Sequence, residues 1–343
     1  MEKREFLQNG TPKIVVLDDD PTGIQTIHGV SVYTDWSVDS IRSGFAEKEQ
    51  IFFILTNSRS FSEEETIRVH RTIADRLVQV SRESGRDFLV VCRGDSTLRG
   101  HYLLEPEIMA RSMEENLGRA VDGEIYCPCF FECGRVTVGD IHYLEEGNQR
   151  IPVSETEFAK DKTFGYKNAH LGRYIEEKTD GRYKAEECLS LPATDDNGTA
   201  DWEKTRLLLH RAEKGRKIVV NALTYEDLDQ FSGILLTELR KGKCFIIRSA
   251  ASFIKSIGGF EEQALLAGDS LRMAGNRNGG LILAGSYVKK TTDQLECLKK
   301  SGLPFEFIEF ETENGRTGEK LGREADRVRR EAQERLCRGE NVV

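Results

Sequence analysis

The sequence predicts an α/β protein of two doubly wound domains with mainly parallel sheets, the second domain incomplete. Short apolar runs rich in β-branched residues alternate with amphipathic helices, a pattern typical of parallel strands joined by helical crossovers. The 343 residues are enough for two domains that each bury a core. Polar residues gather directly after the apolar runs, which is where ligands bind in open α/β sheets.

The first predicted domain covers residues 1–270. Its continuous apolar runs are typical of strands buried on both faces of a sheet, and they span 13–17, 51–55, 87–92 and 124–127. A helix follows Ser62, because Ser62 and Glu65 match the capping-box pattern ahead of an apolar stripe. After a polar, glycine-punctuated stretch at about 160–200, helices and strands are expected in alternation at 202–214, 217–221, 225–240 and 244–248.

The second predicted domain covers residues 278–343 and follows a glycine- and asparagine-rich linker. Its expected elements are a strand at 281–284, a helix from Thr291, a strand at 305–310 and a charged helix from about Gly318 to Cys337. The apolar residues of the last helix fall at helical spacing, which predicts a buried face. Two strands are too few for a stable sheet, so we expect this domain to be truncated and to open first in hydrogen exchange.

The composition argues against several classes of protein. Lys and Arg number 49 against 58 Asp and Glu, and the net charge of −9 argues against a nucleic-acid partner, which needs a basic surface. No apolar run approaches the ~18 residues of a membrane span, and the first residues lack the apolar segment of a signal peptide. The eight cysteines are therefore expected to be reduced, in a cytoplasmic protein without membrane contact. A homo-oligomer and a monomer both remain open.

Polar clusters follow the predicted strands, and together they contain both carboxylates and arginines. They include Asp18-Asp-Asp-Pro-Thr-Gly23, Thr56-Asn-Ser-Arg59 and Arg93-Gly-Asp-Ser-Thr-Leu-Arg-Gly100, and later Asn221, Arg248-Ser249 and Gly285-Ser286. Adjacent carboxylates repel one another, so a metal, a bound hydroxyl group or arginines must offset them, and two guanidiniums suit bidentate carboxylate binding. The clusters predict one polar cleft, although each one alone is also compatible with an ordinary turn or a loop salt bridge.

Several other candidate residues favour structural roles. Cys127, Cys129 and Cys133 lack the paired spacing of a zinc site, so no metal site is assigned. His142 lies in a polar segment, where a structural role is favoured over a catalytic one. No P-loop and no glycine-rich dinucleotide motif is present in the sequence.

The order of the motifs resembles the four-carbon acid sugar kinase family, whose members phosphorylate erythronate-, threonate- or 3-oxo-tetronate-type acids with ATP. The resemblance covers about residues 13–310 and rests on 17–26, 93–101, 128–139, 141–143, 152–156, 248–253 and 285–294. It implies an N-terminal domain that binds the acid sugar and a C-terminal domain that supplies most of the nucleotide site. By position it implies a sugar acid near Asp19, Arg59, Asp95, Ser96, Thr97, Leu98 and Arg99, and ATP near Gly285 and Ser286.

Two features depart from the family pattern. Pro21 stands where many members have another residue, and no late glycine-rich phosphate loop is found before Val343. We therefore expect weak ATP binding and little or no turnover from this chain.

The chemistry of phosphoryl transfer is mostly positioning and charge neutralisation. We expect Arg59 and Arg99 to be the candidates for the sugar's carboxylate, and Asp95 or Asp19 to accept the proton of its terminal hydroxyl. Mg²⁺ would bridge the phosphate oxygens, with Asp18 or Asp20 as outer ligands.

Two alternatives remain at this point. One is a phosphatase of the haloacid dehalogenase type, in which Asp18-x-Asp20-x-Thr22 is the nucleophile loop and Gly268-Asp269-Ser270 is the nearest later acidic segment. The other is a non-catalytic acid-sugar-binding relative that lacks the complete ATP site.

Overall fold

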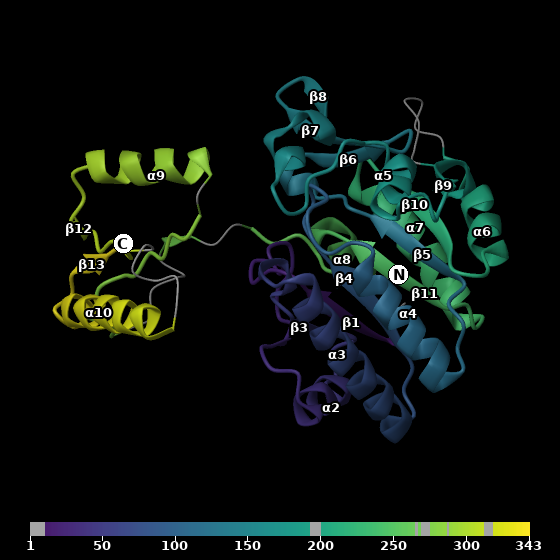
Figure 1. Cartoon of the computed structure of the whole chain (residues 1–343), viewed down its shortest axis with the longest axis horizontal. Coiled ribbons are helices and arrows are strands. Elements are labelled where there is room, and N and C mark those ends of the chain that lie inside the picture. The colour runs from purple at the N-terminus through teal and green to yellow at the C-terminus, as the bar shows by residue number, and fades with distance from the viewer. Residues whose placement is uncertain (1–10, 193–199, 265–266, 269–274, 287, 312–317) are drawn as a thin grey trace. The chain divides into compact units, whose positions relative to one another are not determined.

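The computed structural model divides into two compact units, Met1–Glu262 and Gln263–Val343, called the first and the second unit below (Figure 1). The structure describes residues 11–192, 200–264, 267–268, 275–286, 288–311 and 318–343. Within these ranges, no helix is both long enough and apolar enough to cross a membrane.

Eight parallel strands form the main sheet of the first unit, in the order β2-β3-β1-β4-β11-β5-β10-β9. Their bounds are β1 (Lys13–Asp18), β2 (Val32–Tyr33), β3 (Ile51–Leu55), β4 (Phe88–Arg93), β5 (Gly123–Cys127), β9 (Leu189–Leu191), β10 (Arg216–Val220) and β11 (Phe245–Ser249). The predicted α/β class with mainly parallel strands is confirmed. The chain first adds β2 and β3 on one side of β1 and then crosses to β4 on the other side, so the sheet has a topological switch point at β1.

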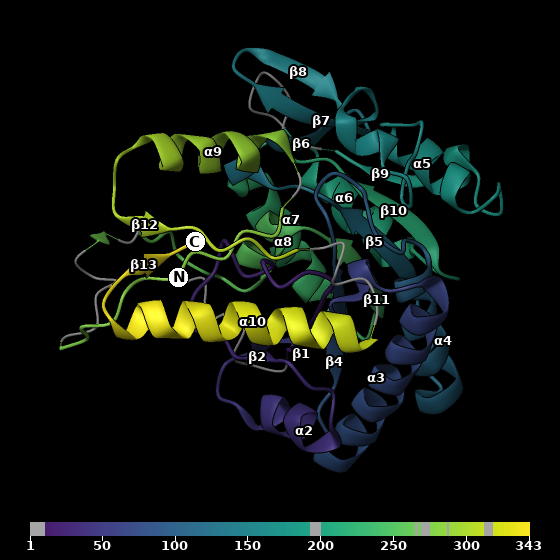
Figure 2. The same ribbon diagram turned by 60° about the vertical axis from the view of Figure 1, so that its left-hand side comes forward.

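Helices cover both faces of this sheet. On one face lie α2 (Val38–Ala46), α3 (Glu63–Ser84) and α4 (Leu104–Leu117), with α3 and α4 side by side in both views (Figures 1 and 2). On the other lie α6 (Trp202–Arg211), α7 (Tyr225–Arg240) and α8 (Ala251–Ile257). Successive residues of β1 point to opposite faces. Val15 therefore lies in the core beneath α2, α3 and α4, and Val16 lies in the core beneath α6, α7 and α8.

The helix boundaries follow local capping chemistry. Ser62 accepts a hydrogen bond from the backbone N–H of Glu65, as the capping-box pattern predicts, while the Glu65 carboxylate pairs with Arg68. A complete capping box forms at α7, between Thr224 and Asp227. Such caps satisfy backbone N–H groups that the first helical turn leaves without partners.

A smaller antiparallel sheet, absent from the sequence prediction, contains β6 (Arg135–Val138), β7 (Ile141–Glu146) and β8 (Gln149–Pro152). Its strands are only partly buried, β6 at its two middle residues and β7 at alternate residues, so they lack the continuous buried runs that marked the main sheet. Near it lies α5 (Leu171–Lys178), and short 3₁₀ turns complete the unit: η1 (Ser58–Ser60), η2 (Phe131–Cys133), η3 (Val153–Glu155), η4 (Glu157–Lys160) and η5 (Ala185–Glu187).

The second unit contains α9 (Lys289–Lys300), α10 (Gly318–Cys337) and a parallel pair of two-residue strands, β12 (Phe305–Glu306) and β13 (Asn341–Val342). The predicted strand at 281–284 is wrong, since only Leu281 makes an isolated bridge, to Val342, and Leu283 is 92% exposed. The predicted strand at 305–310 shortens to its first two residues.

The predicted buried face of α10 is also wrong. Only Glu324 of this helix is buried in the described part of the unit, and Leu321 is 45% exposed. The physical reason is that the β12–β13 pair offers too little apolar area to cover a helix.

Candidate functional site

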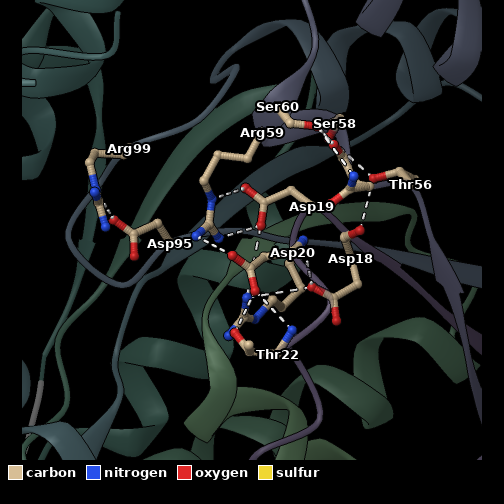
Figure 3. Close-up of polar contacts among 12 residues, drawn as sticks. Asp18, Asp19, Asp20, Thr22, Thr56, Ser58, Arg59, Ser60, Asp95 and Arg99 are labelled. Atoms are coloured by element: carbon tan, nitrogen blue, oxygen red, sulfur yellow. Dashed lines mark hydrogen bonds and ion pairs between the residues drawn. The ribbon is translucent and has the colours of Figure 1, made fainter. Parts of the chain in front are cut away.

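The candidate site lies at the carboxyl ends of β1, β3 and β4, at the topological switch point. Asp18 stands opposite Leu55 of β3 and Arg93 of β4 in the strand register. The carbonyl of Asp18 accepts hydrogen bonds from the backbone N–H and the hydroxyl of Thr56, both at 2.9 Å. These bonds fasten the segments that follow the strands to one another (Figure 3). The polar side chains gathered here, called the strand-end cluster below, are Asp18, Asp19, Asp20, Arg59, Arg93, Asp95, Arg99, Glu105 and Arg248.

Arg59 joins two neighbouring carboxylates of this cluster. Its Nη2 and Nε donate to the two carboxylate oxygens of Asp19, at 2.6 and 3.3 Å, and its Nη1 donates to Asp20 at 2.8 Å. Asn57 adopts a left-handed backbone conformation just before the turn that carries Arg59, and this directs the side chain back over β1. All three guanidinium nitrogens of Arg59 are therefore engaged (Figure 3).

Asp95 and Arg99 form a second pair, beside the first. Arg99 Nε donates to Asp95 Oδ2 at 2.8 Å, and the hydroxyl of Thr97 donates to the same oxygen. Burial acts to raise the pKa of Asp95, but the positive charges of Arg59 and Arg99 prevail and lower it to about 2. Arg99 also lies over the ring of Phe158, 5.0 Å from its centroid. The Asp95 carboxylate is thus ionised at every physiological pH.

The loop between Asp95 and Arg99 is held by hydrogen bonds to its backbone carbonyls. Tyr166 donates to the carbonyl of Thr97 and Tyr174 to that of Leu98, both at 2.8 Å. His142 Nε2 donates to the carbonyl of Ser96 at 2.8 Å, and its Nδ1 accepts from Thr137. Burial lowers the pKa of His142 to about 4, so the ring is neutral, and both of its nitrogens are engaged within the protein.

Arg248 and Glu105 form a fully buried ion pair behind this loop. Arg248 Nη1 contacts Glu105 Oε2, while Arg248 Nη2 lies 3.9 Å from Asp19 Oδ2. Glu105 also accepts a hydrogen bond from Ser58 at 2.7 Å. Burial acts to raise the pKa of Glu105, but Arg248, His70 and Ser58 outweigh it and lower that pKa. The pair therefore carries full charges inside the protein.

Asp18 has a different environment from its neighbours. Its carboxyl group lies 3.4 Å from Arg93 Nη1, and a Cβ on Gly23 would fall 1.5 Å from one of its oxygens, so the chain covers it closely. Burial raises the pKa of Asp18 to about 7, against the partial opposition of Arg93. For Asp20, by contrast, hydrogen bonds from Thr22 and the charge of Arg59 outweigh burial and lower the pKa.

The structure brings most of the sequence-predicted sugar-acid residues together. Asp19, Arg59, Asp95 and Arg99 lie in the strand-end cluster (Figure 3), and Ser96 and Thr97 lie in the loop between the last two. The side chain of Leu98 points into an apolar cluster, so this residue contributes through its backbone. Gly285 and Ser286 belong to the second unit, where both are exposed and Ser286 accepts a hydrogen bond from the N–H of Val288.

Sequence reasoning missed Glu105 as a member of the cluster, whereas Arg248 was among the polar residues expected at the strand ends. The only signal for Arg248 was its place at a strand end, and nothing local marked Glu105, which lies early in α4. Their partnership joins positions 143 residues apart.

The side chains of the strand-end cluster do not by themselves form a metal site. The described ranges of the chain contain no group of three or more His, Cys, Asp or Glu side chains placed to hold a metal ion. The carboxylates of Asp18, Asp19 and Asp20 face arginines instead. These residues do not fit a dedicated Mg²⁺ site. The acidic segment considered for a phosphatase, Asp269-Ser270, lies outside the described residues.

Solved structures share this fold. A Bordetella bronchiseptica protein described as a domain of unknown function (DUF1537), with bound citrate in a domain-swapped dimer, is 17% identical with a TM-score of 0.52, over 92% of this chain and 70% of that one. A putative tRNA synthase from Salmonella typhimurium is 16% identical with a TM-score of 0.53, over 93% and 71%. A Haemophilus influenzae protein of the DUF1537 family is 13% identical with a TM-score of 0.51, over 94% and 72%. These likenesses show the fold alone.

A comparison with curated proteins gives no match. The comparison with protein families does, because residues 14–257 match the family described as sugar-binding N-terminal domain. That stretch includes the whole main sheet and every residue of the strand-end cluster, and it makes up most of the chain. The chain therefore belongs to the family of the sugar-binding N-terminal domain.

Proposed function

We propose that the first unit binds a four-carbon sugar acid and that the protein is an ATP-dependent kinase acting on the terminal hydroxyl of that acid. One observation carries the proposal: an ionised Asp95 paired with a partly exposed Arg99, at the carboxyl edge of the sheet, in a chain of a sugar-binding family. The pair offers acceptors for hydroxyl groups and donors for a carboxylate. The bound citrate of the Bordetella neighbour, a small hydroxy acid, supports the same ligand chemistry.

Arg99 is the better candidate for the carboxylate of the acid. Its Nε is taken by Asp95, and among the described residues Asp161 is the only other acidic side chain near its terminal nitrogens, 4.0 Å from Nη1. Arg59 has each of its nitrogens on Asp19 or Asp20. We therefore assign the carboxylate of the acid to Arg99. The role of Arg59 is to hold the side chains of Asp19 and Asp20 in place.

Asp95 is the better candidate for the hydroxyl that receives the phosphoryl group. Asp19 is almost completely buried, and three guanidiniums surround its carboxylate, those of Arg59, Arg93 and Arg248. A carboxylate with a pKa near 2 is a weak base, so Asp95 acts mainly by orienting the hydroxyl. Orientation is what a loose phosphoryl-transfer transition state needs most.

ATP is assigned to the second unit near Gly285 and Ser286. The donors there suit phosphate oxygens: the Ser286 hydroxyl lies ahead of α9, and Lys289 and Lys290 lie in the first turn of this helix, which has no side-chain cap. ATP supplies the phosphoryl group, and Mg²⁺ would reach the reaction bound to its phosphates.

The phosphatase alternative is weakened by the position of Asp18. A nucleophilic aspartate must be open to a phosphate ester, whereas the chain at Gly23 covers this carboxyl group and Arg93 faces it. A non-catalytic sugar-acid binder remains the other outcome of the test.

The test measures binding and turnover by the same chain. Thermal shift and calorimetry with erythronate, threonate and citrate should detect one tight four-carbon acid, which at ~100 times its dissociation constant adds about 2.7 kcal/mol to the free energy of unfolding. If the chain turns over, Asp95→Asn should lower kcat at least ~100-fold while the fold survives. The matched control is Glu145→Gln in the β7–β8 hairpin, which should leave both values unchanged.

Three outcomes separate the hypotheses. Binding with ATP-dependent phosphorylation supports the kinase. Binding without turnover leaves a sugar-acid binder. Binding of none of the acids, together with hydrolysis of phosphate esters in the presence of Mg²⁺, would point to the phosphatase.

A further inference from the structure

Arg248 occupies a central place in the strand-end cluster although it lies far from Asp19 and Asp95 in the sequence. It is the fourth residue of β11, and its guanidinium is buried between β1 and α4. Nη1 contacts Glu105 of α4, and Nη2 lies 3.9 Å from Asp19. One side chain therefore links the segment directly after β1 with a helix on the face of the sheet.

The loop that carries Asp95 and Arg99 is shaped around this guanidinium. A Cβ on Gly94 would lie 2.0 Å from Arg248 Nη2, and a Cβ on Gly100 would lie 2.8 Å from the same atom and 3.1 Å from Asp19 Oδ2. Gly100 also has a φ of +120°, which side chains rarely adopt. The two glycines flank the Asp95–Arg99 loop, so the guanidinium defines where the loop begins and ends.

Glu105 is itself held in place by α3 and η1. Ser58 donates to its carboxylate at 2.7 Å, and His70 Nε2 lies 3.7 Å from it. His70 Nδ1 in turn hydrogen-bonds with the carbonyl of Thr66 one helical turn earlier. Glu105 thus has a fixed position from which to orient Arg248.

We propose that Arg248 and Glu105 are a buried positioning pair that sets the geometry of both carboxylates of the sugar-acid site. Arg248 acts on Asp19 by its charge, and on Asp95 through the glycines that enclose its guanidinium. Neither residue contacts the sugar acid. The inference rests on the proposed function, in which Asp95 and Arg99 contact that ligand.

A test must separate positioning from stability, since a buried charge that loses its partner destabilises any fold. Arg248→Met alone leaves Glu105 charged and unpaired, so this variant is expected to unfold easily. Arg248→Met combined with Glu105→Gln removes both charges at similar volume, and such neutral replacements are often tolerated. The double variant should fold and yet lack the positioning charge.

The chain offers a matched control at the opposite end of the same sheet. Lys217 and Glu124 form a buried ion pair at the second residues of β10 and β5. The double variant Lys217→Met with Glu124→Gln removes an ion pair of the same kind that is not part of the strand-end cluster.

The measurement is the calorimetric dissociation constant of erythronate or threonate, whichever the wild type binds more tightly, beside the melting temperature of each variant. We expect the Arg248→Met, Glu105→Gln variant to bind at least ~30-fold more weakly, and the control variant to bind within about threefold of the wild type. Arg248→Lys keeps the charge but not the planar fork, so about a tenfold loss is expected.

Each possible result either supports or overturns the inference. If the Arg248→Met, Glu105→Gln variant folds and binds as tightly as the wild type, the inference is wrong while the proposed function stands. If that variant fails to fold, Arg248→Lys decides in the same way: unchanged binding overturns the inference and weakened binding supports it. If the wild type binds neither acid, the proposed function fails and this inference falls with it.

Discussion

A carboxyl group inside a protein keeps its charge only when a cation or several donors lie close to it. Asp18 and Asp20 show both outcomes within three positions of the chain. Burial dominates at Asp18 and raises its pKa to about 7, while Thr22 and Arg59 lower the pKa of Asp20. The two residues should therefore affect stability with opposite dependence on pH.

We expect Asp18 to weaken the fold as the pH rises. The folded chain holds this proton more tightly than the unfolded chain, so the stabilisation is complete below the ordinary Asp pKa and is lost as the pH rises to about 7. Relative to Asp18→Asn, the wild type should lose up to about 4 kcal/mol of unfolding free energy over that window. Urea unfolding of both proteins at a series of pH values measures it.

Asp20→Asn is the control with the opposite sign. Asp20 stabilises the fold above its ordinary pKa, and this contribution disappears as the pH falls through its lowered value. Wild type and Asp20→Asn should therefore differ at neutral pH and converge in acid. Parallel curves for the two substitutions would contradict both assignments.

Gly94 and Gly233 predict opposite effects of the same small change. A methyl group at Gly94 meets the buried guanidinium of Arg248, so Gly94→Ala should lower the unfolding free energy by about 2 kcal/mol or more. No described residue lies within 4 Å of a Cβ at Gly233 in α7, where alanine should add roughly 0.5–1 kcal/mol. Denaturant unfolding of both variants measures this, and a neutral Gly94→Ala would show that Arg248 is free to move.

Some members of the strand-end cluster could be predicted from the sequence, and others could not. Asp95 and Arg99 were found because they lie four positions apart in one motif directly after a strand. Glu105 was not, because its partner lies on β11 and only the folded sheet brings them together. Local patterns carry no information about which distant charge will neutralise a buried one.

At the level of secondary-structure elements, a stack of tyrosine rings stabilises the Asp95–Arg99 loop. Tyr102, Tyr126 and Tyr174 are stacked in the first unit, with ring centroids 4.9 to 5.8 Å apart. Tyr174 belongs to α5 and donates to the carbonyl of Leu98, whose φ is +67°. The helix therefore stabilises a backbone conformation that leucine rarely adopts.

Loss of single hydroxyl groups from this stack should distinguish the tyrosines. Tyr174→Phe leaves the carbonyl of Leu98 buried without its donor and should cost about 1–3 kcal/mol. Tyr102→Phe is the control in the same stack, because the Tyr102 hydroxyl has no hydrogen-bond partner in the part of the chain that the structure describes. Its cost should be near zero by chemical denaturation, and equal costs would refute the role given to Tyr174.

Prediction of the elements succeeded where burial alone decides them. Apolar runs such as Ile51–Leu55 become strands of the main sheet, since both their faces are covered. The run at 281–284 is also apolar but makes only one isolated bridge in the described part of the chain, because strand formation also needs a neighbouring strand. β6–β8 went unpredicted, because none of them is a continuous buried apolar run: β6 is buried only at its two middle residues, and β8 is exposed at Gln149 and Arg150.

On the scale of the whole chain, the two units differ in how much of their surface is covered. In the first unit, two apolar cores lie on the two faces of an eight-stranded sheet. In the second, no described residue of α9 is buried, and several large apolar side chains are exposed, namely Leu281, Ile282, Leu283, Leu303, Phe307, Phe310 and Leu321. Local stability should follow this difference.

We expect the amides of α9 to exchange with solvent at least ~100-fold faster than those of β1, β4 and β11 at neutral pH. The helix has ion pairs such as Lys289–Asp293, but these contribute only a few tenths of a kcal/mol each. Hydrogen exchange followed by mass spectrometry on the full chain measures both regions at once. Equal protection of α9 and β4 would show that the second unit is covered in solution.

The pairing of Asp95 with Arg99 has a further consequence for which ligands the proposed site can accept. Without ligand the two side chains neutralise each other, so an incoming anion competes with an internal carboxylate for the same guanidinium. A carboxylic acid without a hydroxyl group takes the Arg99 donors away from Asp95 and offers Asp95 no donor in their place. A hydroxy acid instead donates its own O–H to the aspartate as its carboxylate binds the arginine. Binding is then an exchange of partners that conserves hydrogen bonds. It discriminates against acetate or succinate without any steric barrier, because an aspartate that loses its donors in a buried site is costly.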